Sequence, residues 1–129
     1  MTTAKSVSTA NLVIIVDDDE SVTEAIPDLL RGCGYRTLAF GSAEAFLASG
    51  RISEGQCLIL DVAMPGMTGP QLKRELASRG YDIPVIFITG LTDEEILSRL
   101  AKEGAVACLS KPFSGRELRA ALAKAIPSS

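Results

Sequence analysis

The chain has 129 residues, a length that fits one compact domain, and 47% of them are hydrophobic, which is enough for a core of ordinary size. Its 13 basic and 16 acidic residues give a formal net charge of -3, which argues against a broad nucleic-acid surface and favours a protein or a small anion as partner. The absence of histidine excludes Ser-His and Cys-His catalytic pairs and histidine-ligated metals, so any chemistry must rest on carboxylates, hydroxyls and lysines.

The first half of the chain is predicted to run strand, helix, strand, helix. Leu12 to Val16 is a continuous apolar strand, and Arg36 to Phe40 is a weaker one. The helix between them has an apolar face at helical spacing, formed by Val22, Ala25, Ile26, Leu29, Leu30 and Cys33. Pro27 within it predicts a kink without a break, because the apolar face continues beyond it. A short helix is expected after Ser42.

The second half repeats the alternation. Its predicted elements are strands at Cys57 to Leu60, Val85 to Ile88 and Val106 to Leu109, a helix near Pro70 to Arg79, and two helices with capping-box starts, Thr92 with Glu95 and Ser114 with Glu117. Glycines at 34, 80 and 104 stand where helices should end. Four of the five strands are unbroken apolar runs, which is typical of a parallel sheet covered by helices on both faces.

Strand and helix thus alternate five times, which predicts a three-layer, doubly wound α/β domain over residues 11 to 126. We expect flexible tails at Met1 to Ala10 and at Pro127 to Ser129. No apolar run reaches the roughly 18 residues of a membrane span and no signal peptide is apparent, so the protein is expected to be cytoplasmic. Cys33, Cys57 and Cys108 are widely spaced among apolar neighbours and are expected to be buried free thiols.

Polar residues follow four of the predicted strands. They are Asp17, Asp18 and Asp19 after the first, Asp61 after the third, Thr89 after the fourth and Lys111 after the fifth. Because ligands bind at the carboxyl edge of an open parallel sheet, these side chains are expected to converge. Clustered carboxylates repel one another and need a cation, and oxygen ligands suit Mg²⁺. A hydroxyl and an ammonium nearby can bind phosphoryl oxygens.

Four motifs at these positions resemble those of response regulator receiver domains, the CheY-like family. They are Val16-Asp17-Asp18-Asp19, Leu60-Asp61-Val62-Ala63-Met64-Pro65-Gly66, Ile88-Thr89-Gly90 and Ser110-Lys111-Pro112-Phe113. The resemblance covers nearly the whole chain, and four ordered motifs are specific where any one alone would be weak. It implies a flavodoxin-like sandwich whose five parallel strands have the order 2-1-3-4-5, with five helices.

The resemblance also implies the roles of the residues. Asp17, Asp18, Asp61 and the backbone carbonyl of Ala63 would hold Mg²⁺, with Mn²⁺ as an alternative. Asp61 would be the phosphoacceptor, and Thr89 and Lys111 would contact the phosphoryl group. The donor would be the phosphohistidine of a sensor histidine kinase or a phosphotransfer protein, so the domain would be a signalling module of a two-component system and not an enzyme.

Output is expected at a switch surface. In the family a hydroxyl residue, here Thr89, moves toward the phosphoryl group, and an aromatic residue near the fifth strand follows it. Cys108 occupies that aromatic position and is too small to repeat the movement, so we expect the signal to pass through residues 90 to 94. The switching face would comprise Asp93 to Lys102, Val106 to Leu109 and Ser114 to Lys124, and would bind a downstream protein or a second copy of the chain. No membrane and no direct nucleic-acid contact is expected.

Two alternatives remain open. A haloacid-dehalogenase-like phosphatase could use Asp17 and Asp19 as its Asp-x-Asp motif, but the stretch from Ala105 to Ser129 contains only Glu117 as an acid, and that family needs further acids late in the chain. A receiver that docks partners without being phosphorylated is the second alternative. For Asp17 to Asp19 alone, a solvated helix start would explain the acids, since acids favour that end of a helix.

Overall fold

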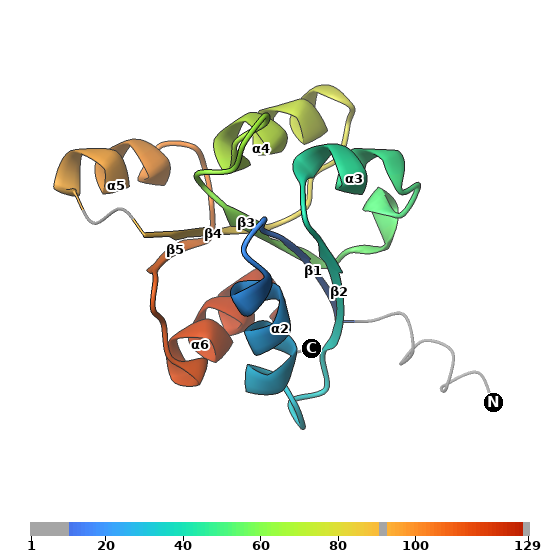
Figure 1. Cartoon of the computed structure of the whole chain (residues 1–129), viewed down its shortest axis with the longest axis vertical. Helices are drawn as coiled ribbons and strands as arrows, with labels where there is room; N and C mark the ends of the chain where they lie inside the picture. Colours follow the sequence, from blue (N-terminus) through green and yellow to red (C-terminus); the bar gives the residue numbers. More distant parts are fainter. Residues whose placement is uncertain (1–10, 91–92, 128–129) are drawn as a thin grey trace.

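The computed structural model describes residues 11–90 and 93–127, and Figure 1 shows its helices and strands with the labels used below. In chain order they are β1 (Leu12–Val16), α2 (Glu20–Leu29), β2 (Arg36–Phe40), α3 (Ala43–Ala48), η1 (Ile52–Glu54), β3 (Cys57–Asp61), α4 (Gly69–Ser78), β4 (Val85–Thr89), α5 (Glu94–Ala101), β5 (Ala107–Ser110) and α6 (Gly115–Ala125). The predicted alternation of strand and helix is confirmed, and the short 3-10 helix η1 was not predicted. The predicted tail from Met1 to Ala10 and the last two residues lie outside the described residues.

The strands form one parallel sheet of order β2-β1-β3-β4-β5, which confirms the predicted order. The three central strands, β1, β3 and β4, are buried along their whole length, whereas the edge strands β2 and β5 are partly exposed. In Figure 1, α2 and α6 lie on one face of the sheet and α3, α4 and α5 on the other. The chain therefore forms the predicted three-layer sandwich.

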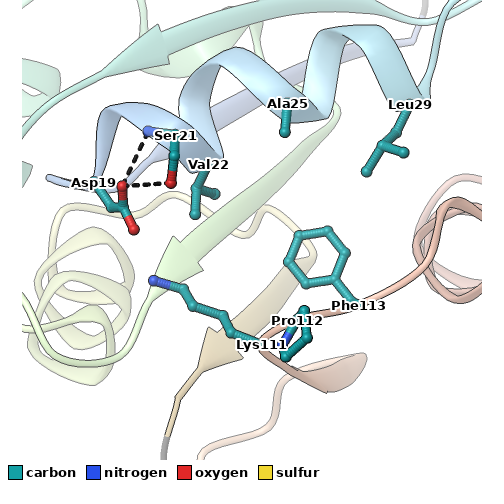
Figure 2. A pocket seen from close by; sticks show the side chains of 8 residues that line it. All are labelled: Asp19, Ser21, Val22, Ala25, Leu29, Lys111, Pro112 and Phe113. Atoms are coloured by element: carbon teal, nitrogen blue, oxygen red, sulfur yellow. Dashed lines mark hydrogen bonds between the residues drawn. The ribbon is translucent and has the colours of Figure 1, made fainter.

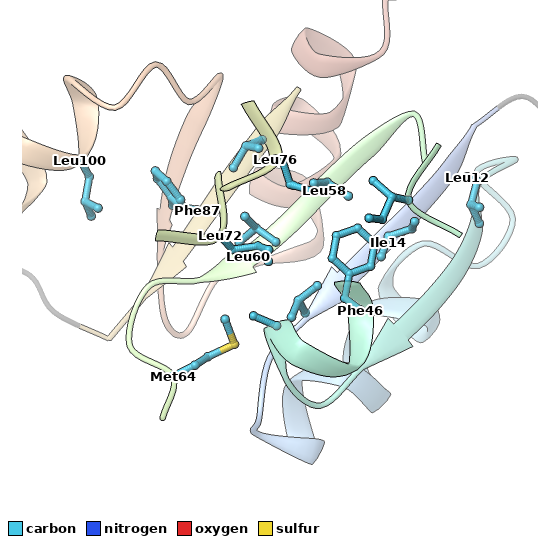
Figure 3. Packing of buried hydrophobic residues seen from close by; sticks show 14 residues of the cluster. Leu12, Ile14, Phe46, Leu58, Leu60, Met64, Leu72, Leu76, Phe87 and Leu100 are labelled. Carbon is cyan, nitrogen blue, oxygen red and sulfur yellow. The ribbon is translucent and has the colours of Figure 1, made fainter. Parts of the chain in front are cut away.

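Side chains of successive strand residues point to opposite faces, so the core has two halves. In β1, Ile14 packs into the half under α3, α4 and α5, and Ile15 packs into the half under α2 and α6. Figure 3 shows the first half, where Phe46 of α3 and Leu72 of α4 lie over strand residues that include Leu60. Each such fully buried side chain contributes about 1.5–3 kcal/mol of transfer free energy. The two halves fix the central strands, whose carboxyl ends carry the polar residues.

The first helix, α2, is not broken by Pro27. Proline lacks the N–H that would complete one helical hydrogen bond. The helix nevertheless continues beyond it, and the backbone N–H of Leu30 donates to the carbonyl of Ile26 at 3.0 Å. Ile26 and Leu30 are buried, so packing of the apolar face holds the helix together past the proline, as predicted.

The helix starts follow the predicted capping chemistry with one correction. Ser42 and Ser114 are N-caps, and Ser114 forms the predicted capping box with Glu117. The box predicted at Thr92 is wrong. The N-cap of α5 is Asp93, whose carboxylate accepts from the backbone N–H of Glu95 at 2.8 Å, and Thr92 lies outside the described residues. Aspartate caps helices at least as well as threonine, so the start shifts by one residue.

The helix ends and the cysteines correct two predictions in part. The glycines at 34, 80 and 104 all have positive φ, but of the three only Gly80 directly follows a helix C-cap. The helix α2 ends at Leu29 with Leu30 as its C-cap, so it stops before Cys33 and Gly34, where the apolar pattern indicated its end. The prediction of three buried thiols is wrong for two of them. Cys57 is buried, but Cys33 and Cys108 are exposed, the latter because β5 is an edge strand. Within residues 11–90 and 93–127, no helix has the length and apolarity needed to cross a bilayer.

Candidate functional site

The carboxyl ends of the four strands β1, β3, β4 and β5 meet at one edge of the sheet. Asp17 follows β1 directly, Asp61 and Thr89 are the last residues of β3 and β4, and Lys111 follows β5. Each of these strands thus ends beside its neighbour, and the backbone N–H of Lys111 donates to the carbonyl of Thr89 at 2.7 Å. β3 and β4 each run one residue farther than the apolar pattern indicates, so the buried sheet itself carries Asp61 and Thr89.

Three carboxylates form a cluster at this edge. Asp17, Asp18 and Asp61 each offer one oxygen atom, and these oxygens all lie within 4.8 Å of one another. Asp17 and Asp61 are only 1% and 5% exposed, whereas Asp18 is exposed. Two unit charges at such a distance repel by about 3 kcal/mol at an effective dielectric of 20. The cluster is therefore costly unless a cation joins it, and three carboxylate oxygens fit the preference of Mg²⁺ for hard oxygen ligands.

Lys111 supplies part of the missing positive charge. Its Nζ lies 3.2 Å from Oδ2 of Asp17 and 3.5 Å from Oδ1 of Asp61. Burial by itself disfavours the charged ammonium, but the attraction of Asp17 and then of Asp61 outweighs it, so the pKa of Lys111 is raised. Oδ2 of Asp17 is fully buried and makes no hydrogen bond among the described residues, so the ion pair with Lys111 is its polar contact. One ammonium thus bridges both buried carboxylates.

The electrostatics of Asp61 set it apart from the other carboxylates of the chain. Burial, and then the negative charge of Asp17, raise the pKa of Asp61 to about 6. Lys111 and the backbone N–H of Ala63, which lies 3.5 Å from Oδ1 of Asp61, oppose the rise without cancelling it. Shifts of this size are typical of functional sites, because a carboxylate held in a buried acidic cluster is poised to bind a cation or to react.

Asp19 belongs to the helix and not to the cluster. Its carboxylate caps α2 by accepting from the backbone N–H of Ser21 at 2.9 Å and from the hydroxyl of Ser21 at 2.7 Å. The bond from the Ser21 hydroxyl is the main reason why the pKa of Asp19 is lowered. The backbone N–H of Asp19 donates to Oδ1 of Asp17 at 2.9 Å and helps to fix that side chain. This arrangement weighs against the phosphatase alternative, which needs the Asp19 carboxylate free to act on a substrate.

The remaining predicted site residues differ in position. Thr89 is 1% exposed and lies at the edge where the carboxylates cluster. Ala63 lies in the loop after β3, with its N–H near Asp61. Cys108 is exposed and lines a cavity of about 360 Å³ between β5 and α6, on the flank of the sheet. Leu91 stands two residues after Thr89, and the family resemblance implies that this position and Ala63 control hydrolysis of the phosphoryl group; it lies outside the described residues.

A cavity of about 360 Å³ adjoins the acidic cluster, and Figure 2 shows its lining. Asp19, Ser21 and Lys111 supply its polar groups, and the other lining residues are Val22, Ala25, Leu29, Pro112 and Phe113. The ring of Phe113 faces α2 across the cavity (Figure 2). This cavity could not be predicted from the sequence, because its two walls are far apart along the chain.

Comparisons with known proteins identify relatives of the whole domain. The sequence model of the family described as response regulator receiver domain matches residues 13–123. Nodulation protein W of Bradyrhizobium diazoefficiens is 43% identical over 111 residues, which cover 86% of this chain and 49% of that protein. Response regulator protein TmoT of Ectopseudomonas mendocina is 43% identical over 117 residues, covering 90% of this chain and 53% of that protein. The chain thus spans about half the length of these relatives.

Solved structures give the same fold. The crystal structure of FixJ-N superimposes with a TM-score of 0.79 at 33% identity and covers 92% of this chain and 95% of that one. A response regulator receiver protein from Burkholderia phymatum superimposes with a TM-score of 0.79 at 35% identity, covering 92% of this chain and 97% of that one.

Proposed function

Because the chain belongs to the response regulator receiver family, we propose that Asp61 accepts a phosphoryl group in a Mg²⁺-dependent reaction and that this changes a binding surface of the domain. The observation that carries the proposal is the buried pair Asp17 and Asp61, bridged by the ammonium of Lys111. The carboxylates of such a site can bind a cation, one of them can act as the nucleophile, and the ammonium can bind the negatively charged phosphoryl group. The domain acts in signalling and is not proposed to turn over a substrate.

The donor set fits a hard divalent cation. Asp17, Asp18 and Asp61 would hold Mg²⁺, or Mn²⁺, with the backbone carbonyl of Ala63 as a further oxygen ligand. The ion would neutralise the clustered carboxylates and bind a phosphoryl oxygen. By favouring the ionised form of Asp61, this neutralisation would also lower its raised pKa and keep the nucleophile charged.

Phosphoryl transfer then needs little from the chain beyond placement and charge. A carboxylate oxygen of Asp61 forms the new bond to phosphorus while the bond from phosphorus to the imidazole nitrogen of the donor breaks. Lys111, which lies 3.5 Å from Asp61, is placed to shift its ammonium from the carboxylates to the phosphoryl oxygens. The Thr89 hydroxyl would donate to another of those oxygens. The donor would be the phosphohistidine of a sensor histidine kinase or a phosphotransfer protein.

The output surface is proposed to be α5, β5 and α6. Thr89 is the last residue of β4, and β4 pairs with β5. A movement of Thr89 toward a phosphoryl group would therefore shift the edge strand β5 and the packing beneath α5. Cys108 is exposed on β5, so its side chain cannot move into or out of the core as a switching aromatic residue would. The movement would therefore pass through the segment that joins β4 to α5. A downstream protein or a second copy of the chain would bind there. Direct contact with nucleic acid is not proposed for this chain.

The test of the phosphoacceptor is intact-protein mass spectrometry after incubation with Mg²⁺ and acetyl phosphate. The wild-type chain should acquire one phosphoryl group that is lost on mild alkaline treatment, and Asp61→Asn should acquire none. The same experiment with chelator in place of Mg²⁺ should give no adduct. An adduct of equal yield on Asp61→Asn, or none on the folded wild type, would contradict the proposal.

A further inference from the structure

Gly69, the first residue of α4, touches the backbone of Asp61. A Cβ atom at position 69 would lie 2.5 Å from the carbonyl oxygen of Asp61, 3.1 Å from its carbonyl carbon and 3.3 Å from Cα of Val62. Contacts below 3.0 Å are essentially never made by real Cβ atoms, and all three neighbours are main-chain atoms that cannot rotate away. Gly69 is buried, so no solvent-filled space is available to relieve the contact.

The need for glycine here does not come from backbone conformation. Gly69 does not have a positive φ, and alanine is the better helix former. The other close contacts of glycine Cβ positions differ in kind. At Gly55 a Cβ would meet the side chain of Ile14, at Gly66 that of Glu44 and at Gly115 that of Arg119. All eleven glycines of the chain lie in its described part. Gly69 is the one among them at which an added Cβ atom would lie less than 3.0 Å from a backbone atom.

The Asp61 peptide is fixed on its other side as well. The backbone N–H of Val62 donates to the carbonyl of Ile88 in β4 at 3.0 Å, and the N–H of Gly69 donates to the carbonyl of Val62 at 3.3 Å. The Asp61 to Val62 linkage therefore lies between a central strand and the start of α4. The helix is itself anchored, because Leu72 and Leu76 are buried in the core. Neither neighbour can move without disturbing packing.

We propose that Gly69 is a positioning residue for Asp61: by letting α4 begin in contact with the Asp61 peptide, it sets where the Asp61 carboxylate stands relative to Asp17 and Lys111. A methyl group at position 69 must separate α4 from the Asp61 peptide by at least the difference between 2.5 Å and 3.0 Å. A misplacement of about 1 Å in an active site can lower a reaction rate about 100-fold. A separation of about half an ångström should therefore lower the phosphorylation rate about tenfold or more. The ligand set of a metal with strict octahedral geometry is equally sensitive.

The experiment compares Gly69→Ala with Gly55→Ala. Gly55 is the matched control because it is also buried, its Cβ would meet Ile14 at 2.9 Å, and it lies before the opposite end of the same strand, away from the acidic cluster. Three quantities are measured on each folded variant. They are the rate of phosphorylation by acetyl phosphate with its half-saturating concentration, the affinity for Mn²⁺ by electron paramagnetic resonance, and the amide NMR shifts of residues 61 to 63.

Gly69→Ala should be phosphorylated at least about tenfold more slowly at saturating acetyl phosphate, bind Mn²⁺ more weakly and shift the amides of residues 61 to 63. Gly55→Ala should remain within about twofold of wild type in rate and metal affinity even if it is less stable. Wild-type rate, metal affinity and amide shifts in Gly69→Ala would overturn the inference, as would equal losses in Gly55→Ala, since those would reflect stability alone.

If Gly69→Ala does not fold in buffer, the comparison is made in trimethylamine N-oxide, which favours the compact state without contacting the site. Recovery of wild-type rate and metal affinity with the fold would then overturn the inference, and a persistent loss would support it. The rate measurement rests on the proposed function, whereas the Mn²⁺ affinity and the amide shifts do not. If wild type is never phosphorylated, the proposed function fails, and these two readouts still decide the role of Gly69.

Discussion

Replacing Asp61 by asparagine should stabilise the metal-free protein at neutral pH while it removes the proposed phosphoacceptor. The folded structure raises the pKa of Asp61 from 3.8 to about 6, because the carboxylate is buried beside Asp17. Since one pKa unit corresponds to about 1.4 kcal/mol, the ionised carboxylate lowers the free energy of unfolding by on the order of 3 kcal/mol above the folded pKa. Asparagine removes the charge, and its amide can donate to Asp17, although burying an amide has its own cost.

The expected net gain in the free energy of unfolding is therefore on the order of 1 to 3 kcal/mol, and each 1 kcal/mol corresponds to about 3–5 °C in Tm for a domain of this size. The sign of the pH dependence follows from the raised pKa. Below pH 3.8 Asp61 is protonated in both the folded and the unfolded state, so the two proteins differ little on this account. As the pH rises from 3.8 to about 6, only the wild type loses stability, so the advantage of Asp61→Asn appears in this window and is complete above it.

The assay is urea unfolding followed by circular dichroism, in chelator, at about pH 8 and about pH 4. The exposed residue Asp82 offers a control, Asp82→Asn, whose stability should equal that of wild type at both pH values. Mg²⁺ should stabilise wild type at about pH 8, because the proposed site binds it in the folded state, and should stabilise Asp61→Asn much less. A variant less stable than wild type in chelator at about pH 8 would refute the electrostatic account of the site.

Three further predictions concern the metal, the lifetime of the phosphorylated form and the output surface. Asp18→Ala should weaken Mg²⁺ binding at least about tenfold and leave the free energy of unfolding in chelator unchanged, whereas the control Asp82→Ala should change neither. If Asp18→Ala binds Mg²⁺ as tightly as wild type, Asp18 is not a ligand. The side chains of Ala63 and Leu91 cannot hold a water by hydrogen bonding, so loss of the phosphoryl group should be slow; faster decay in wild type than in both Ala63→Asn and Leu91→Glu would contradict this. Beryllofluoride with Mg²⁺ should shift amide NMR signals along α5 and β5 in both wild type and Cys108→Ala. Shifts confined to the neighbourhood of Asp61 would exclude the proposed route. Loss of the response in Cys108→Ala would show that the Cys108 thiol does the switching.

Much of the fold was predictable because local patterns decide it. Continuous apolar runs located the central strands, since strands buried on both faces need no polar residues. The same patterns could not distinguish a central strand from an edge strand, which is why Cys108 was expected in the core and is exposed on β5. The start of α5 was missed by one residue, because Thr92 and Asp93 are both good caps and sequence alone cannot decide between them.

The site was predictable to the extent that it depends on strand ends. Parallel strands bring their carboxyl ends to one edge whatever the loops do, so Asp17, Asp61 and Lys111 could be expected to meet there. What could not be predicted depends on contacts between distant segments. Gly69, next to a proline at a helix start, looks like ordinary helix-start chemistry until its contact with the Asp61 peptide is seen. The cavity between α2 and Phe113 is likewise formed only by the folded chain.

Whether Asp61 is the phosphoacceptor can be decided by locating the phosphoryl group in the chain. Borohydride reduction of an aspartyl phosphate converts the residue to homoserine, and tryptic cleavage then separates residues 52–73, where Asp61 is the sole aspartate, from residues 6–31, which contain Asp17, Asp18 and Asp19. After incubation with Mg²⁺ and acetyl phosphate, homoserine should be found in the 52–73 peptide and at position 61 alone. Homoserine in the 6–31 peptide would contradict this assignment and would favour a phosphatase-like use of the first acidic motif.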